Sequence, residues 1–177
     1  MQSIKHPAHA CDDTSPLTGA FRLALRGFGS TVTVVSTAED GARHAMVATA
    51  TMSVSLEPPV LLIAVNQSAS CHDPLARRGA FCVNVLGAGH AALGGKIARA
   101  ASLDRFGVGD WRYCDDDALK DIPFLEESQS AIFCTVRERW QRGTHSLIAG
   151  DVRHVVTSSD ADPLLYCNGA YGHFSPL

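Results

Sequence analysis

The 177-residue sequence lacks the short motifs by which several common enzyme classes are recognised. It has no G-x-G-x-x-G turn after a strand, no P-loop, no G-x-S-x-G elbow and no H-E-x-x-H pair. These patterns supply phosphate cradles, an activated serine or a zinc site. Their absence disfavours the usual nucleotide-binding folds, serine hydrolases and zinc proteases.

The sequence also lacks an excess of one charge and a long apolar run. Its 15 Lys and Arg residues oppose 18 Asp and Glu residues, which gives a formal net charge of −3. Nucleic-acid-binding domains are usually basic, so we expect no nucleic-acid partner. No run approaches the roughly 20 apolar residues that span a bilayer, so we expect no membrane partner. Residues 1–16 have no apolar core, which predicts a flexible arm without a signal peptide, and hence a cytoplasmic location.

Close-spaced cysteines are missing as well. The chain has six cysteines but no C-x-x-C pair, and its eight histidines are scattered. A structural metal site usually needs ligands at close spacing, so we expect no metal. We predict that the cysteines are reduced thiols and that several lie in buried strands.

Most of the sequence consists of segments that are rich in β-branched residues or that alternate apolar and polar residues. Short apolar stretches separated by Gly, Pro and Asp predict strands, and an i, i+4, i+7 apolar stripe predicts a helix at the start. The strands are expected at residues 31–37, 43–55, 60–65, 80–86, 131–140, 145–158 and 164–168. Helices are expected at residues 17–28 and 88–100, with one helical turn at 74–79, and residues 101–125 are expected to be mostly loop. Gly150 is expected to form a bulge.

The order of these elements predicts the fold class. About seven strands cluster as hairpins and do not alternate with long helices, which favours a mainly β fold with short helices. We therefore predict one domain over residues 17–177, built as a small antiparallel, Greek-key-like β-barrel.

One predicted strand carries a row of hydroxyl groups. Thr49, Thr51, Ser53 and Ser55 recur with period 2, so a regular strand would place them on one face. Hydroxyls both donate and accept hydrogen bonds and could bind the edge of a planar polar ring. The following loop, 66-NQSAS-70, adds further polar groups. Alternatively, Thr and Ser simply suit a half-exposed strand.

Two further stretches hold candidate functional side chains. His145 begins an apolar strand just after a glycine in 143-GTHSLIAGDV-152, where it could contact a ligand or carry a proton. It could equally be an ordinary surface histidine. Tyr171 and Phe174 stand near the C-terminal end, where they could stack on a planar ligand or anchor the tail to the core.

Six segments in series resemble the short-chain flavin reductases. These are the reductase components of two-component flavin monooxygenases, such as that of 4-hydroxyphenylacetate hydroxylase. The segments that carry the resemblance are 21-FRLAL-25, 31-TVTVVS-36, 45-AMVATATMSVSLEPP-59, 68-SAS-70 with 81-FCVNVL-86, 143-GTHSLIAGDV-152, and 163-PLLY-166 with 169-GAY-171. They cover roughly residues 20–174 in the order of the family.

The resemblance implies a fold, an activity and a site. It implies a homodimeric FMN-binding split barrel that uses NADH or NADPH to reduce FMN or FAD and supplies the reduced flavin to a separate oxygenase. His145 would be the catalytic histidine, and with Tyr171 it would line the nicotinamide pocket. The implied flavin-binding residues are Ser30, Thr31, Met46, Val47, Ala48, Thr49, Ala50, Ser53, Asn66, Ser68, Ser70 and Cys71.

Two other functions fit the same residues. The protein could be a barrel of this kind that keeps its flavin and reduces another acceptor. It could also be a non-catalytic barrel that binds flavin or haem. The sequence alone does not distinguish FMN from FAD, or NADH from NADPH.

Overall fold

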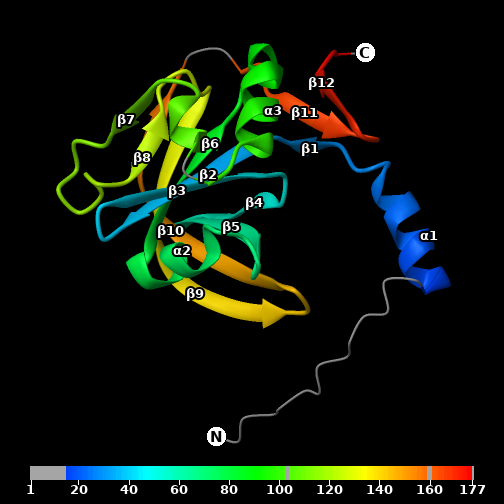
Figure 1. Ribbon diagram of the computed structural model, residues 1–177, viewed down its shortest axis with the longest axis horizontal. Helices are drawn as coiled ribbons and strands as arrows, with labels where there is room; N and C mark the ends of the chain where they lie inside the picture. The colour runs from blue at the N-terminus through cyan, green and yellow to red at the C-terminus, as the bar shows by residue number, and fades with distance from the viewer. Residues whose placement is uncertain (1–14, 103, 159–160, 177) are drawn as a thin grey trace, which may run out of the picture.

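A computed structural model describes residues 15–102, 104–158 and 161–176, which form a mainly β fold (Figure 1). The helices are α1 (Pro16–Leu25), α2 (His72–Arg78), η1 (Ala88–His90), α3 (Ala91–Arg99) and η2 (Asp104–Gly107). The strands are β1 (Ser30–Thr31), β2 (Thr33–Glu39), β3 (Ala42–Ala48), β4 (Thr51–Leu56), β5 (Pro59–Asn66), β6 (Ala80–Val85), β7 (Trp111–Tyr113), β8 (Pro123–Leu125), β9 (Ser130–Arg142), β10 (His145–Thr157), β11 (Leu164–Cys167) and β12 (Ala170–His173). None of the helices among these residues is long and apolar enough to cross a membrane.

Seven antiparallel strands form the main sheet, in the order β3-β2-β6-β9-β10-β5-β4. Its two outermost strands, β3 and β4, are consecutive in the sequence and are joined by Thr49 and Ala50. The N–H of Ala64 in β5 donates to the carbonyl of Ala50 at 2.9 Å, so this link lies beside β5. The sheet therefore curls back on itself, and the chain passes from one edge strand to the other.

Three apolar clusters stabilise the fold. The largest lies inside the curled sheet, with Val35, Ile63, Phe81 and Ile148 contributed by four of its strands. A second cluster packs α3 against the outer face of β2 and β3, and a third packs residues 119–124 against β6 and β9. β-Branched residues suit these half-buried pleated surfaces, because their side chains pack well across strands.

A small second sheet lies beside α3, in the order β1-β11-β12 (Figure 1). β1 leads back to α1, which stands away from the rest of the molecule in Figure 1. α1 begins at Pro16, and the Ser15 hydroxyl accepts a hydrogen bond from the Thr18 N–H at 3.1 Å as the N-cap. No residue of α1 is buried, so its apolar stripe is not covered within the described chain.

Much of the predicted fold is confirmed. The antiparallel, mainly β class holds, and each of the predicted strands outside residues 43–55 corresponds to an observed strand with shifted ends. The bulge is also confirmed, because the β9–β10 register shifts between Ala149 and Gly150. The arm predicted over residues 1–16 lies almost wholly outside the described residues, as does Cys11.

Other predictions about the elements are wrong. The single strand expected over residues 43–55 is two strands, β3 and β4, on opposite edges of the sheet. Thr49 lies in the link between them, and the β4–β5 register shifts between Ser53 and Ser55. The four hydroxyls therefore do not share one face. β12 was not predicted, whereas the expectation that residues 101–125 are mostly loop holds, with the short elements η2, β7 and β8 between the loops.

Candidate functional site

One end of the curled sheet brings several of the predicted site residues together. His145 begins β10 and lies directly opposite Asn66, the last residue of β5. Ala64 lies two residues before Asn66 in β5, and its backbone N–H donates to the Ala50 carbonyl at 2.9 Å. The predicted histidine, the loop after β5 and the β3–β4 link thus meet at one place, although Ala50 and His145 are 95 positions apart in the sequence.

The His145 side chain is exposed and held through one ring nitrogen. Its Nδ1 lies 3.0 Å from the Thr144 hydroxyl. Because Nδ1 is engaged there, Nε2 is the nitrogen that remains for a ligand. An exposed imidazole held in this way can donate to, accept from or orient a bound molecule.

The β4 strand next to this end offers both apolar and polar groups. Among the described residues, β4 pairs along one edge only, with β5. Backbone N–H and C=O groups along its other edge can hydrogen-bond a ligand. Met52 of the same strand is 58% exposed. A flavin ring has one apolar and one polar end, so this strand has the chemistry to hold it.

The loop after β5 is shaped by Asn66. Its side-chain Oδ1 accepts hydrogen bonds from both the N–H and the hydroxyl of Ser68, each at 2.9 Å. This is the local turn that Asn favours, because its side chain mimics a backbone carbonyl. Ser68 and Ser70 are exposed, so their polar groups can reach a ligand.

Four of the predicted flavin-binding side chains face the interior. Met46 and Ala48 pack into the cluster inside the sheet, and Val47 packs into the cluster under α3. Cys71 is fully buried, and burial raises the pKa of its thiol to about 12. The buried side chains of Ala48 and Cys71 stabilise the fold, whereas Met46 and Val47 are only partly buried.

The remaining predicted residues lie in the small sheet. Ser30 and Thr31 form β1 and pair with Tyr166 and Leu165 of β11. Tyr171 of β12 pairs with Tyr166, and the two rings meet edge to face with centroids 5.5 Å apart. In the described part of the chain, no strand pairing connects Tyr171 to His145. The structure therefore divides the predicted residues into two groups.

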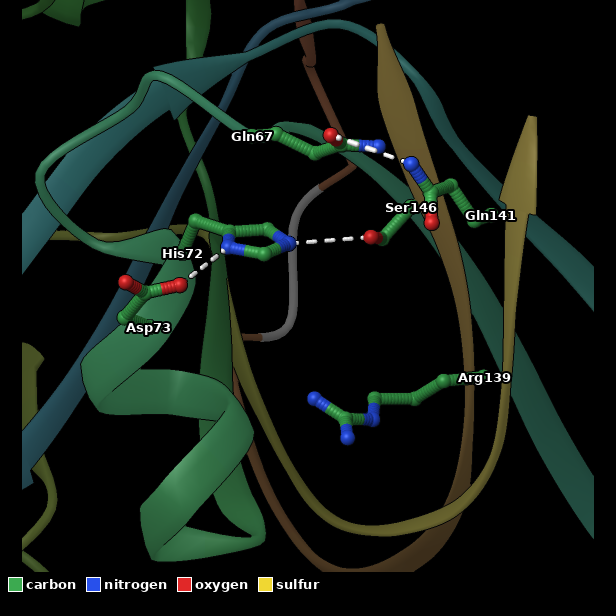
Figure 2. A pocket seen from close by; sticks show the side chains of 6 residues that line it. All are labelled: Gln67, His72, Asp73, Arg139, Gln141 and Ser146. Carbon is green, nitrogen blue, oxygen red and sulfur yellow. Dashed lines mark hydrogen bonds and ion pairs between the residues drawn. The ribbon is translucent and has the colours of Figure 1, made fainter. Parts of the chain in front are cut away.

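A polar hollow lies on the other face of β10 and was not predicted. Its volume is about 650 Å³, and Figure 2 shows side chains from α2, β9, β10 and the loop after β5 around it. The lining residues are Gln67, His72, Asp73, Arg139, Gln141 and Ser146. Successive side chains in a strand point to opposite faces, so Ser146 enters this hollow while its neighbour His145 does not. The strand alternation around His145 was the sequence signal that could have identified Ser146.

The sequence of this chain matches a family model described as "Flavin reductase like domain" over residues 25–175. The chain belongs to this family. The resemblance predicted from its motifs is therefore confirmed. Of the described helices and strands, only residues 16–24 of α1 lie outside this match. The family assignment therefore covers nearly the whole described fold.

Relatives of known name support the same assignment. The chain is 35% identical over 153 residues to the FMN reductase (NADH) RutF of Methylorubrum populi, covering 86% of this chain and 74% of the relative. It is 35% identical over 159 residues to the reductase component of the FADH(2)-dependent resorcinol hydroxylase of Rhizobium sp., covering 88% and 87%. Among solved structures, the NADH:FAD oxidoreductase SgcE6 of Streptomyces globisporus superposes with a TM-score of 0.80 at 26% identity, covering 98% of this chain and 95% of SgcE6. The predicted split-barrel fold of this flavin reductase family is confirmed.

Proposed function

We propose that this chain is an NADH-dependent flavin reductase that passes reduced flavin to a separate oxygenase. The observation that carries the proposal is the family match over residues 25–175. The relatives support this enzyme class and its flavin and nicotinamide cofactors, since they are an FMN reductase that uses NADH and the reductase component of a hydroxylase. We also propose a cytoplasmic location, because the electron donor is an intracellular metabolite.

We propose that flavin lies along β4 and the loop after β5. The free edge of β4 would hydrogen-bond the polar end of the ring, and exposed Met52 would contact its apolar end. Ser68 and Ser70 would hold the phosphate-bearing end. When bound, flavin accepts a hydride from the nicotinamide. The protein contributes orientation and electrostatics to that transfer.

His145 is proposed to orient the nicotinamide or to move a proton at Nε2. Thr144 holds Nδ1 at 3.0 Å and so fixes the ring, and the pairing with Asn66 fixes the backbone. Both contacts place the imidazole beside the loop that would hold flavin. Tyr171 belongs to the other group of residues, and we propose that it completes the pocket from a second subunit.

A homodimer is proposed on the exposed apolar surface of α1 and β4. The large exposed apolar side chains there are Leu17, Phe21, Leu23, Leu25, Met52, Val54 and Leu56. Isolated helices shorter than about 12–15 residues are marginal in water, and α1 has 10 residues with none buried. A second copy that covers α1 would explain why it is stably helical.

The first experiment measures NADH and NADPH oxidation with and without added FMN or FAD. We expect NADH oxidation to require added flavin and to saturate with it. If the protein keeps its flavin bound and oxidises NADH only when another electron acceptor is added, the result would instead favour an enzyme that retains its flavin. Flavin binding without any nicotinamide oxidation would favour a non-catalytic barrel and would overturn the proposal.

The role of His145 is tested by the His145→Ala variant. We expect kcat for NADH oxidation to fall by about tenfold or more, because nicotinamide orientation is lost, with flavin affinity unchanged. His154→Ala, an exposed histidine at the other end of β10, is the matched control and should keep the wild-type rate. Equal rates for wild type and His145→Ala would remove the proposed role.

A further inference from the structure

The tip of the β9–β10 hairpin has little apolar packing of its own. Residues 137–145 are all exposed, and the tip extends beyond the buried part of the sheet. Segments with few buried apolar contacts open locally at low free energy. His145 lies in this tip, so strand pairing with β5 and β9 and contacts between side chains, and not the apolar core, must hold it in place.

One contact across the hollow joins α2 to the hairpin. His72 Nε2 lies 2.9 Å from the Ser146 hydroxyl, and His72 Nδ1 lies 2.7 Å from Asp73 Oδ1 (Figure 2). The His72 side chain is only 14% exposed. The Asp73 carboxylate accepts only, so Nδ1 carries a proton and neutral His72 accepts the Ser146 O–H at Nε2. If His72 is protonated, Nε2–H can donate to the same hydroxyl, so the contact persists in both states.

A second set of contacts joins the loop after β5 to the hairpin. The backbone N–H of Gln67 donates to the Thr144 carbonyl at 3.0 Å, and its side-chain amide donates to the Gly143 carbonyl at 3.4 Å. The Gln141 amide donates in turn to Gln67 Oε1 at 3.3 Å. Gln67, the residue after Asn66, therefore binds both the turn of the hairpin and the end of β9.

We propose that His72, Ser146 and Gln67 are positioning residues for His145. They hold the hairpin tip from the hollow, while His145 projects from the opposite face of β10. Ser146 is the next residue in the chain, so any movement of Ser146 displaces the imidazole. This inference rests on the proposed function, because it assigns a use to the position of His145.

Asp73, His72 and Ser146 also stand in the acid–histidine–hydroxyl order of nucleophilic hydrolases. In those enzymes the carboxylate that orients the histidine is buried. The Asp73 side chain is 70% exposed, so water screens its effect on the imidazole. This exposure favours a positioning role for the histidine and serine over a nucleophilic one.

The test compares Ser146→Ala, Ser146→Thr, His72→Ala and the double alanine variant by steady-state kinetics. We expect each alanine variant to lower kcat for NADH oxidation by about tenfold, with flavin affinity retained, because the reacting groups are misplaced. Ser146→Thr keeps a hydroxyl and should restore the rate. The double variant should be no slower than either single variant, because the two substitutions remove the same contact between His72 and Ser146. Thr157→Ala, at the far end of β10, is the control for loss of a strand hydroxyl.

A spectroscopic readout separates positioning from general loss of stability. The chain has two tryptophans, Trp140 in the hairpin and Trp111 in β7. With fluorotryptophan in both positions, the ¹⁹F resonance of Trp140 should shift or broaden in the alanine variants while that of Trp111 stays unchanged. Wild-type kcat in both alanine variants, or equal changes at both tryptophans, would overturn the inference. An inactive wild type would instead overturn the proposed function, and the Trp140 resonance would still test the contact.

Discussion

Gly150 is the residue at which packing leaves no room for a side chain. It lies in β10 at the register shift with β9, and its backbone faces the cluster inside the sheet. A Cβ atom there would lie 2.7 Å from Phe81 Cζ and 2.8 Å from Cys134 Cβ. Phe81 and Cys134 are fully buried, so neither can move away without disturbing the core.

The Gly150→Ala variant should therefore be less stable than the wild type. Overpacking of a core costs about 1–3 kcal/mol, which corresponds to a fall in Tm of about 5 °C in a protein of this size. Thermal unfolding followed by circular dichroism measures it. Gly172→Ala is the matched control, because Gly172 also lies in a strand and its Cβ would meet nothing within 4 Å. Equal Tm values for the two variants would contradict the assignment of Gly150 to a closed core.

Individual side-chain directions were harder to predict than which segments the fold brings together. His145 and Asn66 could be proposed from their motifs, and the structure pairs them. Cys71 follows the same polar loop, yet its thiol is buried and the pKa of that thiol is raised to about 12. Loop residues have no repeating face, so the sequence contains no periodic signal for which of them turns inward.

At the scale of elements, α2 is a short helix held by contacts along its length. Leu75 is buried inside the sheet, and Gly79 ends the helix with a φ of 69°. Arg77 forms a two-point ion pair with Glu39 of β2. Arg78 forms another with Asp121, with contacts of 3.0 and 2.6 Å. These contacts fix the helix whose first residue, His72, reaches the hairpin.

The Arg78–Asp121 pair predicts how stability changes with pH. The hydrogen bond from Arg78 lowers the pKa of Asp121 in the folded protein. A lowered folded-state pKa stabilises the fold above the unfolded value of about 4, and this stabilisation is lost as the pH falls through the folded-state pKa. Asp121→Asn should therefore lower the Tm at neutral pH and approach the wild type in acid. The Asp121 side chain is 51% exposed, so we expect at most about 1 kcal/mol.

The control for this prediction is Asp117→Asn. The Asp117 side chain is 99% exposed and forms a loose ion pair with Lys120 at 3.4 Å, so its removal should leave the Tm unchanged. A Tm difference between Asp121→Asn and wild type that stayed constant down to low pH would show that the ion pair is not its source.

The β3–β4 division shows why element boundaries were predicted less well than element types. Residues 43–55 alternate as one strand would, and none of them is a proline. The chain nevertheless leaves one edge of the sheet after Ala48 and joins the other edge at Thr51. Closure of the sheet imposes this change of partner, and closure depends on contacts with β5 that are distant in sequence. Local periodicity carries no information about such contacts.

At the scale of the whole molecule, the apolar surface is unevenly distributed. Phe21 of α1 is 61% exposed and Leu56 of β4 is 83% exposed. Exposed apolar patches on proteins mark interaction sites when they are contiguous. β7, which holds the exposed Tyr113, lies on the other side of the molecule from α1 in Figure 1. The proposed dimer therefore predicts that a substitution on α1 and a substitution on β4 each disrupt the dimer, whereas a substitution on β7 does not.

The proposed dimer is tested by Phe21→Glu and Leu56→Glu in sedimentation velocity experiments. We expect wild type to sediment as a dimer and both variants to dissociate, because each would bury a charge in an apolar interface. Flavin-dependent NADH oxidation should fall with dissociation, since Tyr171 of the second subunit would no longer complete the pocket. Tyr113→Glu should remain dimeric and active. If the wild type is an active monomer, both the dimer and the shared pocket are wrong, and Tyr171 must act, if at all, within its own chain.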